Sequence, residues 1–169
     1  PIISEAVRGV KITVGPPFYN QVNVPIGLAL LALIGIGPVI AWRRATFSNL
    51  KKNFLKPVSA GIVAAVVLFP VIPLGNRTEI YTYITFVLCV FVLTSMFTEF
   101  YKGTVSRMGL HDESAVGALA TMTWHNKRRY GGYIVHIGVV LIFAGIAGSQ
   151  AYGTHTEKHL QIGESFETR

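Results

Sequence analysis

The sequence predicts an all-α integral membrane protein with four transmembrane helices and the start of an extracytoplasmic β module at the C-terminus. Of its 169 residues, 51% are hydrophobic and only 14% are charged, proportions typical of membrane proteins. Charged residues are absent from long runs such as residues 130–149, which as a helix would reach about 30 Å, the thickness of a bilayer core. We therefore expect an extracytoplasmic or interfacial segment over residues 1–23, a membrane region over residues 24–149 and the beginning of an extracytoplasmic domain over residues 150–169.

The net charge of +7 and the pI near 9.8 fit membrane topology better than nucleic-acid binding. The basic residues flank apolar runs and form no stripe interleaved with aromatic residues, which a nucleic-acid surface would need. The single cysteine, Cys89, lies within an apolar run, which excludes a disulfide framework and a thiolate metal cluster. Because the chain starts at Pro1 without a signal-peptide pattern, we expect it to be a piece of a longer protein or a processed product.

The first transmembrane helix is expected over residues 24–42, which carry no charged side chain. Pro25 suits the first turn of a helix, where a missing amide donor costs nothing. Pro38 is expected to kink the helix near its end, and Gly35 belongs to a small-residue face suited to close helix contact. Ahead of this helix, the Gly-Pro-Pro sequence at residues 15–17 predicts a break in regular structure.

Residues 57–74 and 80–98 are predicted as the second and third transmembrane helices, because neither run contains a charged residue. The second run is short for a bilayer, and Pro70 and Pro73 predict that it ends irregularly. The third run ends at Glu99. We interpret this carboxylate as interfacial, with a role in proton handling as the alternative.

Residues 100–129 form the longest polar connection in the chain. The adjacent His111, Asp112 and Glu113 suggest a metal site at first sight. Three successive side chains on a helix point in different directions, however, so a solvated loop is the favoured interpretation. His125 follows Trp124, and anchoring of the indole at the membrane interface explains that pattern.

The positive-inside rule sets the expected orientation. Placing the first and third connections in the cytoplasm puts ten of the fifteen Lys and Arg residues there, and the opposite orientation would invert that bias. Because four helices return the chain to the side on which it began, both chain ends are expected outside the cytoplasm, with the protein in the inner (plasma) membrane. The ten residues are Arg43, Arg44, Lys51, Lys52, Lys56, Lys102, Arg107, Lys127, Arg128 and Arg129.

His136 is the only ionisable side chain, tyrosines apart, within the fourth predicted helix, residues 130–149. An imidazole at that depth needs a partner, and a neutral imidazole in a dry bundle is a ready axial ligand for haem iron. The alternative is a histidine hydrogen-bonded to a neighbouring helix. Gly132 and Gly138 flank it, and glycines allow a flat macrocycle or another helix to come close to the backbone.

The tail, residues 150–169, turns polar and alternates around residues 159–162 before a Gly-Glu-Ser sequence, which predicts a strand and a turn. His155 and His159 are four residues apart and would share one face of a helix as metal ligands. The nearby glycine and the alternation argue against a helix there, so a metal site is not the favoured interpretation.

The soluble catalytic motifs are absent, since the sequence contains no Walker loop, GxGxxG, HExxH or Gly-x-Ser-x-Gly elbow. Two classes of function therefore remain. One is a haem-binding membrane protein that uses His136. The other is a transporter-type or structural membrane subunit, in which His136 pairs with a neighbouring helix and prolines mark broken helices around a substrate path.

Three stretches resemble the CcmF family of cytochrome c-type biogenesis proteins, the haem lyase subunit of the System I pathway. Residues 14–20 read VGPPFYN, residues 35–43 read GIGPVIAWR, and residues 128–138 read RRYGGYIVHIG. The resemblance covers essentially the whole chain but only a later portion of that family. The tryptophan-rich haem-binding segment of the family, its two flanking histidines and the first of its intramembrane histidines have no match here.

The resemblance implies that His136 is an axial ligand of a resident haem b, with the trans ligand supplied by another part of the protein. It also implies a membrane haem lyase that attaches haem to the Cys-x-x-Cys-His thiols of apocytochrome c. The implied partners are the haem chaperone CcmE, the thiol-handling subunit CcmH, apocytochrome c and the lipid bilayer, without nucleic acid. We expect the chain alone to be inactive in ligation, because the haem platform is missing.

Overall fold

The computed structural model describes residues 6, 7, 9, 16–40, 47–111 and 113–153, and within these residues the regular structure is helical. The β module predicted over residues 150–169 lies mostly outside the described residues, as do His155 and His159. Its first residues continue a helix instead of turning extended. The helices are α2 (Pro16–Ile36), the 3-10 turn η1 (Gly37–Val39), α3 (Phe47–Leu68), α4 (Arg77–His111), α5 (Ala115–His125) and α6 (Lys127–Tyr152).

Helix α4 is the centre of the bundle, and α2, α3, α5 and α6 all pack against it. Its buried side chains recur at helical spacing, from Thr82 and Thr85 through Cys89 and Val92 to Met96, so that one stripe of the helix faces its neighbours. Small polar groups join it to α6. The Thr82 hydroxyl donates to the carbonyl of Ala147 at 3.4 Å.

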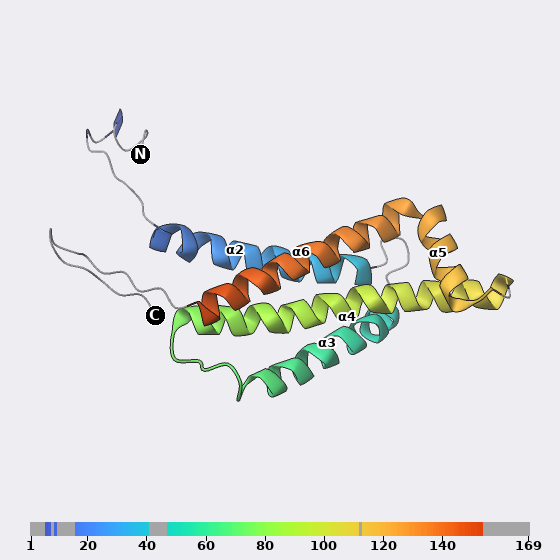
Figure 1. Ribbon diagram of the computed structural model, residues 1–169, viewed down its shortest axis with the longest axis horizontal. Helices are drawn as coiled ribbons and strands as arrows, with labels where there is room; N and C mark the ends of the chain where they lie inside the picture. The colour runs from blue at the N-terminus through green and yellow to red at the C-terminus, as the bar shows by residue number, and fades with distance from the viewer. Residues whose placement is uncertain (1–5, 8, 10–15, 41–46, 112, 154–169) are drawn as a thin grey trace, which may run out of the picture.

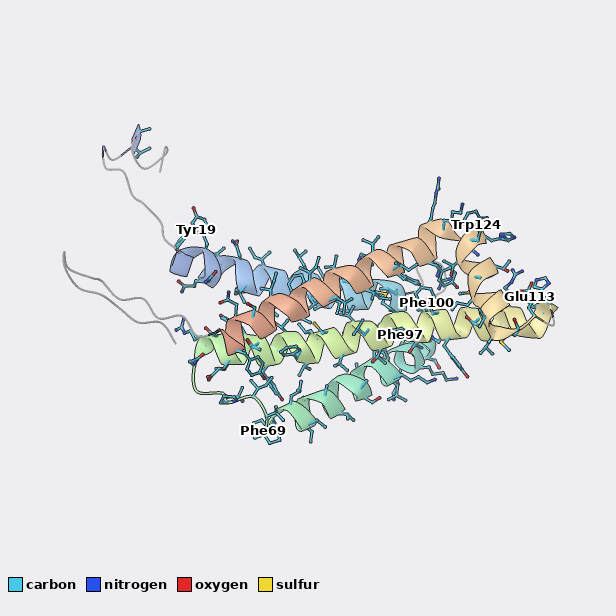
Figure 2. The ribbon with its side chains drawn as sticks, viewed as in Figure 1. Tyr19, Phe69, Phe97, Phe100, Glu113 and Trp124 are labelled. Carbon is cyan, nitrogen blue, oxygen red and sulfur yellow. The ribbon has the colours of Figure 1, made fainter. Side chains whose placement is uncertain are left out.

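The helices alternate in direction along the bundle (Figure 1). Helices α2 and α4 begin at the end where α6 finishes, and α5 closes the opposite end by joining α4 to α6. Exposed aromatic side chains mark both ends, with Tyr19 at one and Trp124 at the other (Figure 2). Such rings favour the headgroup level of a membrane.

Three helices are long and apolar enough to cross a membrane, namely α2 with η1 (Phe18–Val39), α4 and α6. The second predicted transmembrane helix, residues 57–74, is not supported in that form. Helix α3 begins ten residues earlier and carries Lys51, Lys52 and Lys56 in its first half, which lowers its apolar length. It ends at Leu68, just before Pro70, as the prolines predicted.

Three local expectations are wrong. Helix α2 does not begin at residue 24 but at Pro16, and Pro16 and Pro17 occupy its start, where proline is favoured. The chain directly ahead of Pro16, where a break was predicted, lies outside the described residues. Pro25 accordingly lies inside α2 and not in its first turn. The third predicted helix, expected to end at residue 98, continues as α4 to His111, and α5 follows almost at once.

Candidate functional site

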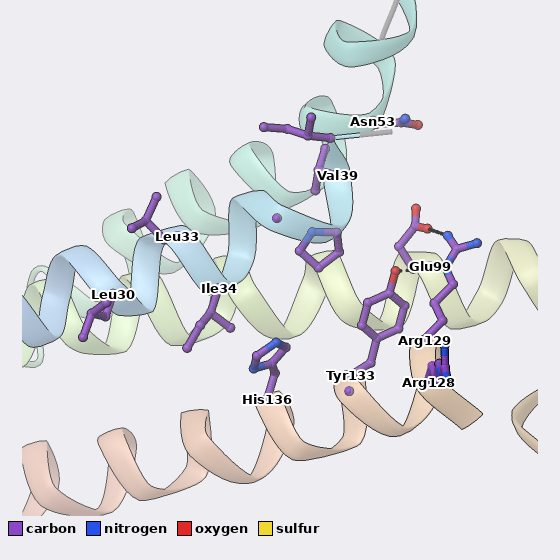
Figure 3. Close-up of a pocket in the computed structure, with 14 residues that line it drawn as sticks. Leu30, Leu33, Ile34, Val39, Asn53, Glu99, Arg128, Arg129, Tyr133 and His136 are labelled. Atoms are coloured by element: carbon purple, nitrogen blue, oxygen red, sulfur yellow. Dashed lines mark hydrogen bonds and ion pairs between the residues drawn. The ribbon is translucent and has the colours of Figure 1, made fainter. Parts of the chain in front are cut away.

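An open groove of about 1100 Å³ lies between the last turns of α2 and the first turns of α6. One stretch of its wall is apolar and comes from α2 and η1, whereas the end nearest the start of α6 is charged (Figure 3). The described lining residues are Leu30, Leu33, Ile34, Gly37, Pro38, Val39, Ile40, Asn53, Glu99, Arg128, Arg129, Gly132, Tyr133 and His136.

His136 is half-buried on α6, and its ring points across the groove towards α2, close to Ile34 (Figure 3). The imidazole forms no hydrogen bond with another described residue. Gly132, one turn earlier, also lines the groove. Apart from the neighbouring helix backbone, no atom lies within 4 Å of the position that a Cβ would take at Gly132, so a ligand can approach the α6 backbone beside the ring. Gly138, two residues beyond His136, is on a different face of α6 and is not among the described lining residues.

Glu99 of α4 links three helices at the charged end of the groove. Its Oε2 accepts a hydrogen bond from Arg129 of α6 at 2.6 Å, and its Oε1 accepts one from Lys102 at 3.2 Å. Lys102 in turn donates to Asn53 of α3 at 2.8 Å. The Glu99 side chain is only 11% exposed, so this carboxylate sits within the bundle between two cations.

Aromatic residues support this end of the groove. Phe100, Tyr130 and Tyr133 form a mutual cluster with ring centroids 5.2 to 5.9 Å apart. Arg129 donates from its Nε to the Tyr133 hydroxyl at 3.1 Å. Gly103 makes this packing possible, because a Cβ there would collide with the Tyr130 hydroxyl and the Met122 sulfur. The cluster holds α6 against α4 and thereby fixes the position of His136 one turn beyond Tyr133.

These groups suit a flat, mostly apolar ligand that carries a metal and acidic substituents. A neutral imidazole supplies a nitrogen ligand for iron, the leucine and isoleucine side chains of α2 supply an apolar wall, and Arg128 and Arg129 supply positive charge at one end. The donor set therefore fits a haem. Among the described residues no group of three His, Cys, Asp or Glu side chains could hold a bare metal ion.

The other residues singled out in the sequence do not join this groove. Glu113 accepts two hydrogen bonds from Arg107, at 2.8 and 2.9 Å, and this pairing lowers the pKa of its carboxyl below the ordinary value. Asp112 lies outside the described residues, and His111 and His125 are exposed.

Sequence reasoning did not identify the polar residues at the charged end of the groove. Glu99 was interpreted as an interfacial carboxylate, with a role in proton handling as the alternative. Arg129 was counted only among the cytoplasmic basic residues, and Tyr133 was assigned no role in a site. A signal was present, because Arg129, Tyr133 and His136 follow one another at intervals of four and three residues. Side chains with that spacing share one face of a helix.

The fold and the groove define a polytopic helical membrane protein with a histidine facing a largely apolar groove between two helices. Comparison with known proteins identifies relatives of this chain. The chain is a homologue of the cytochrome c-type biogenesis proteins CcmF and CycK, with which it shares about a quarter of its residues over nearly its whole length. No protein-family model and no solved structure matches it.

The individual similarities agree closely. The chain is 26% identical over 163 residues to the cytochrome c-type biogenesis protein CycK of Rhizobium meliloti, covering 96% of this chain and 23% of that protein. It is 25% identical over 167 residues to CcmF of Pseudomonas fluorescens, covering 99% and 24% respectively. CcmF of Pseudomonas aeruginosa is 25% identical over 170 residues, with the same coverage. The chain thus spans about a quarter of the length of these relatives.

Proposed function

We propose that this chain is part of a membrane haem lyase of cytochrome c maturation and that His136 is one axial ligand of its resident haem b. The observation that carries the proposal is the half-buried imidazole that faces an open groove of about 1100 Å³ without a hydrogen bond to a described residue. The names of the relatives, cytochrome c-type biogenesis proteins, support the pathway.

A haem bound in the groove would supply a one-electron redox centre. The chain's own residues would hold and orient it. The nitrogen of His136 would ligate iron from the α6 side, Leu30, Leu33 and Ile34 would exclude water from one face, and Arg129 would be held in place by Glu99. The remaining part of the longer protein, apocytochrome c, CcmE and CcmH are the proposed partners.

The proposed topology has four crossings, with both described chain ends outside the cytoplasm of the inner membrane. Helices α2 and α4 begin at the same end of the bundle (Figure 1), so the chain between them must return across the membrane if both are transmembrane. Helix α3, with 22 residues, is about 33 Å long at ~1.5 Å per residue. Its lysines can extend towards the cytoplasmic interface, while Ile62, Val63 and Val66 are exposed for lipid contact.

Absorption spectroscopy of the purified full-length protein that contains this chain tests the haem proposal. The reduced wild-type protein should show a low-spin b-type spectrum, which His136→Ala should abolish or strongly weaken because iron loses a ligand. The matched control is His125→Ala, which changes an exposed histidine on α5 away from the groove. A colourless wild-type protein, or an unchanged spectrum in the His136 variant, would refute the proposal.

A further inference from the structure

A second cavity, of about 630 Å³, lies at the opposite end of the bundle from His136. It is bounded by the first turns of α2 and α4 and the last turns of α6, which meet at that end (Figure 1). The described lining residues are Asn20, Gln21, Asn23, Val24, Gly27, Leu28, Arg77, Thr78, Tyr81, Thr82, Thr85, Phe143, Ile146, Ala147 and Gln150.

The polarity of the cavity changes along the helices. The residues nearest the ends of the helices are polar and exposed, including Asn20, Asn23, Arg77 and Gln150. The residues one or two turns further into the bundle, such as Leu28 and those around Phe143, are apolar. The cavity therefore passes from a hydrogen-bonding mouth to a hydrocarbon-like interior, as the ends of membrane-spanning helices do at a bilayer surface.

The charge at the mouth is positive. Arg77 forms no ion pair with a described residue, and none of the described lining residues is acidic. Glu79 is near in sequence, but its carboxylate accepts hydrogen bonds from the backbone amides of Gly75 and Asn76 at 2.8 and 3.0 Å and forms no ion pair with Arg77. The Glu79 amide in turn donates to the Asn76 side chain at 2.9 Å. That capping box fixes the start of α4 and leaves the Arg77 guanidinium available to an anion.

The deeper hydroxyl groups are already satisfied within the protein. Thr82 donates to Ala147 at 3.4 Å and Thr85 donates to Tyr81 at 2.7 Å, both to backbone carbonyls. The side chains available for hydrogen bonds with a ligand are therefore those at the mouth of the cavity. Contact between Gly27 of α2 and Phe143 of α6 brings the two helices together within the lining, since a Cβ on the glycine would lie 3.2 Å from the ring.

We propose that this cavity binds an anionic phospholipid, with its phosphate near Arg77 and the amide side chains, and an acyl chain along Val24, Leu28 and Phe143. Charge complementarity favours an anionic headgroup over a zwitterionic one. The apolar interior favours a lipid over a soluble anion, which would leave that surface uncovered. This site is separate from the groove of His136 and does not depend on haem.

Native mass spectrometry and thermal unfolding of the full-length protein in detergent test the proposal. Phosphatidylglycerol should remain bound and raise the melting temperature, while phosphatidylcholine and inorganic phosphate should have little effect. Arg77→Gln should weaken phosphatidylglycerol binding roughly fivefold, the expected loss for one basic residue at an anionic headgroup. Lys52→Gln, an exposed cation on α3 outside the cavity, is the matched control and should bind as the wild type does.

A second pair of variants keeps the test decisive if the Arg77 variant folds poorly. Gln150→Glu at the exposed mouth should weaken binding of phosphatidylglycerol, and Gln150→Lys should strengthen it. Equal binding of phosphatidylcholine, or a full thermal shift with phosphate alone, would overturn the proposal. Protection of Gln150→Cys from a maleimide reagent in lipid-free detergent would also overturn it, because a segment of the longer protein would then cover the cavity.

Discussion

Glu99 shows how one carboxylate can organise a site in a chain with few charges. It is the acceptor for Arg129 and for Lys102, and the tyrosine that holds Arg129 lies one turn before His136. The position of the imidazole thus depends on a charge pair that joins α4 to α6. Hydrogen bonds to charged groups that are partly buried contribute more than the average hydrogen bond.

A double-mutant cycle measures this link. Glu99→Gln and Arg129→Met should each lower the free energy of unfolding by roughly 1–3 kcal/mol, because each leaves a charged partner without its counterpart. The double variant should recover about 1 kcal/mol relative to the sum of the single changes. Lys102→Met serves as the comparison, since its contact with Glu99 is longer, at 3.2 Å against 2.6 Å for Arg129. Strict additivity of the Glu99 and Arg129 effects would show that the pair contributes nothing.

Helix contacts rather than helix propensities determine the arrangement of α2 and α4. Gly35 lies where the two helices cross, and a Cβ there would fall 2.6 Å from the Phe91 ring and 2.9 Å from a Val92 methyl carbon. Gly37, two residues later, has no atom within 4 Å of the same position. The two glycines therefore form a matched pair of sites with different surroundings.

Gly35→Ala should lower the free energy of unfolding by about 1–3 kcal/mol, the typical cost of overpacking a tight interface. Gly37→Ala should leave it almost unchanged. Thermal unfolding in detergent, followed by circular dichroism, compares the two variants directly. Similar melting temperatures for both would mean that the close approach of α2 to α4 is not a stability determinant.

The stability of the junction between α4 and α5 should depend on pH. Pairing with Arg107 lowers the pKa of Glu113 in the folded state, so the pair stabilises the junction above the ordinary glutamate pKa of about 4.3. That contribution is lost as the pH falls through the lowered folded-state pKa. The protection factors of α5 amides, which correct for the pH dependence of intrinsic exchange, should therefore fall between about pH 5 and pH 3. Glu113→Gln should exchange faster at neutral pH and show no such transition; an identical transition in this variant would assign it to another group.

The elements themselves were largely predictable. Long uncharged runs predicted the apolar parts of α2, α4 and α6, because hydropathy is a property of the local sequence. The extensions were not predictable in the same way. Helix α4 continues through Lys102 and Arg107 to His111 because Phe100, Gly103 and Met122 pack it against α5 and α6, and tertiary contacts of this kind override a polar composition.

At the scale of the whole molecule, the bundle has two cavities with different linings, one towards each end. The groove with His136 lies towards the end of the bundle where α6 begins, and the second cavity lies at the end where α2 and α4 begin. Sequence reasoning found His136 because an ionisable group in an apolar run is conspicuous. It did not find either cavity, since each combines residues from helices that are far apart in the sequence.

Whether α3 crosses the membrane decides the topology of the whole chain. Ser48 lies at the start of α3, and Leu74 lies between α3 and α4; both are exposed. With four crossings, Leu74→Cys should react with a membrane-impermeant maleimide in intact cells, and Ser48→Cys should react only after the membrane is opened. Cys89 is 4% exposed and should stay unreactive as an internal control. Labelling of both positions from the same side would leave α3 on the membrane surface, and because α2 and α4 run in the same direction, one of them could then not span the bilayer.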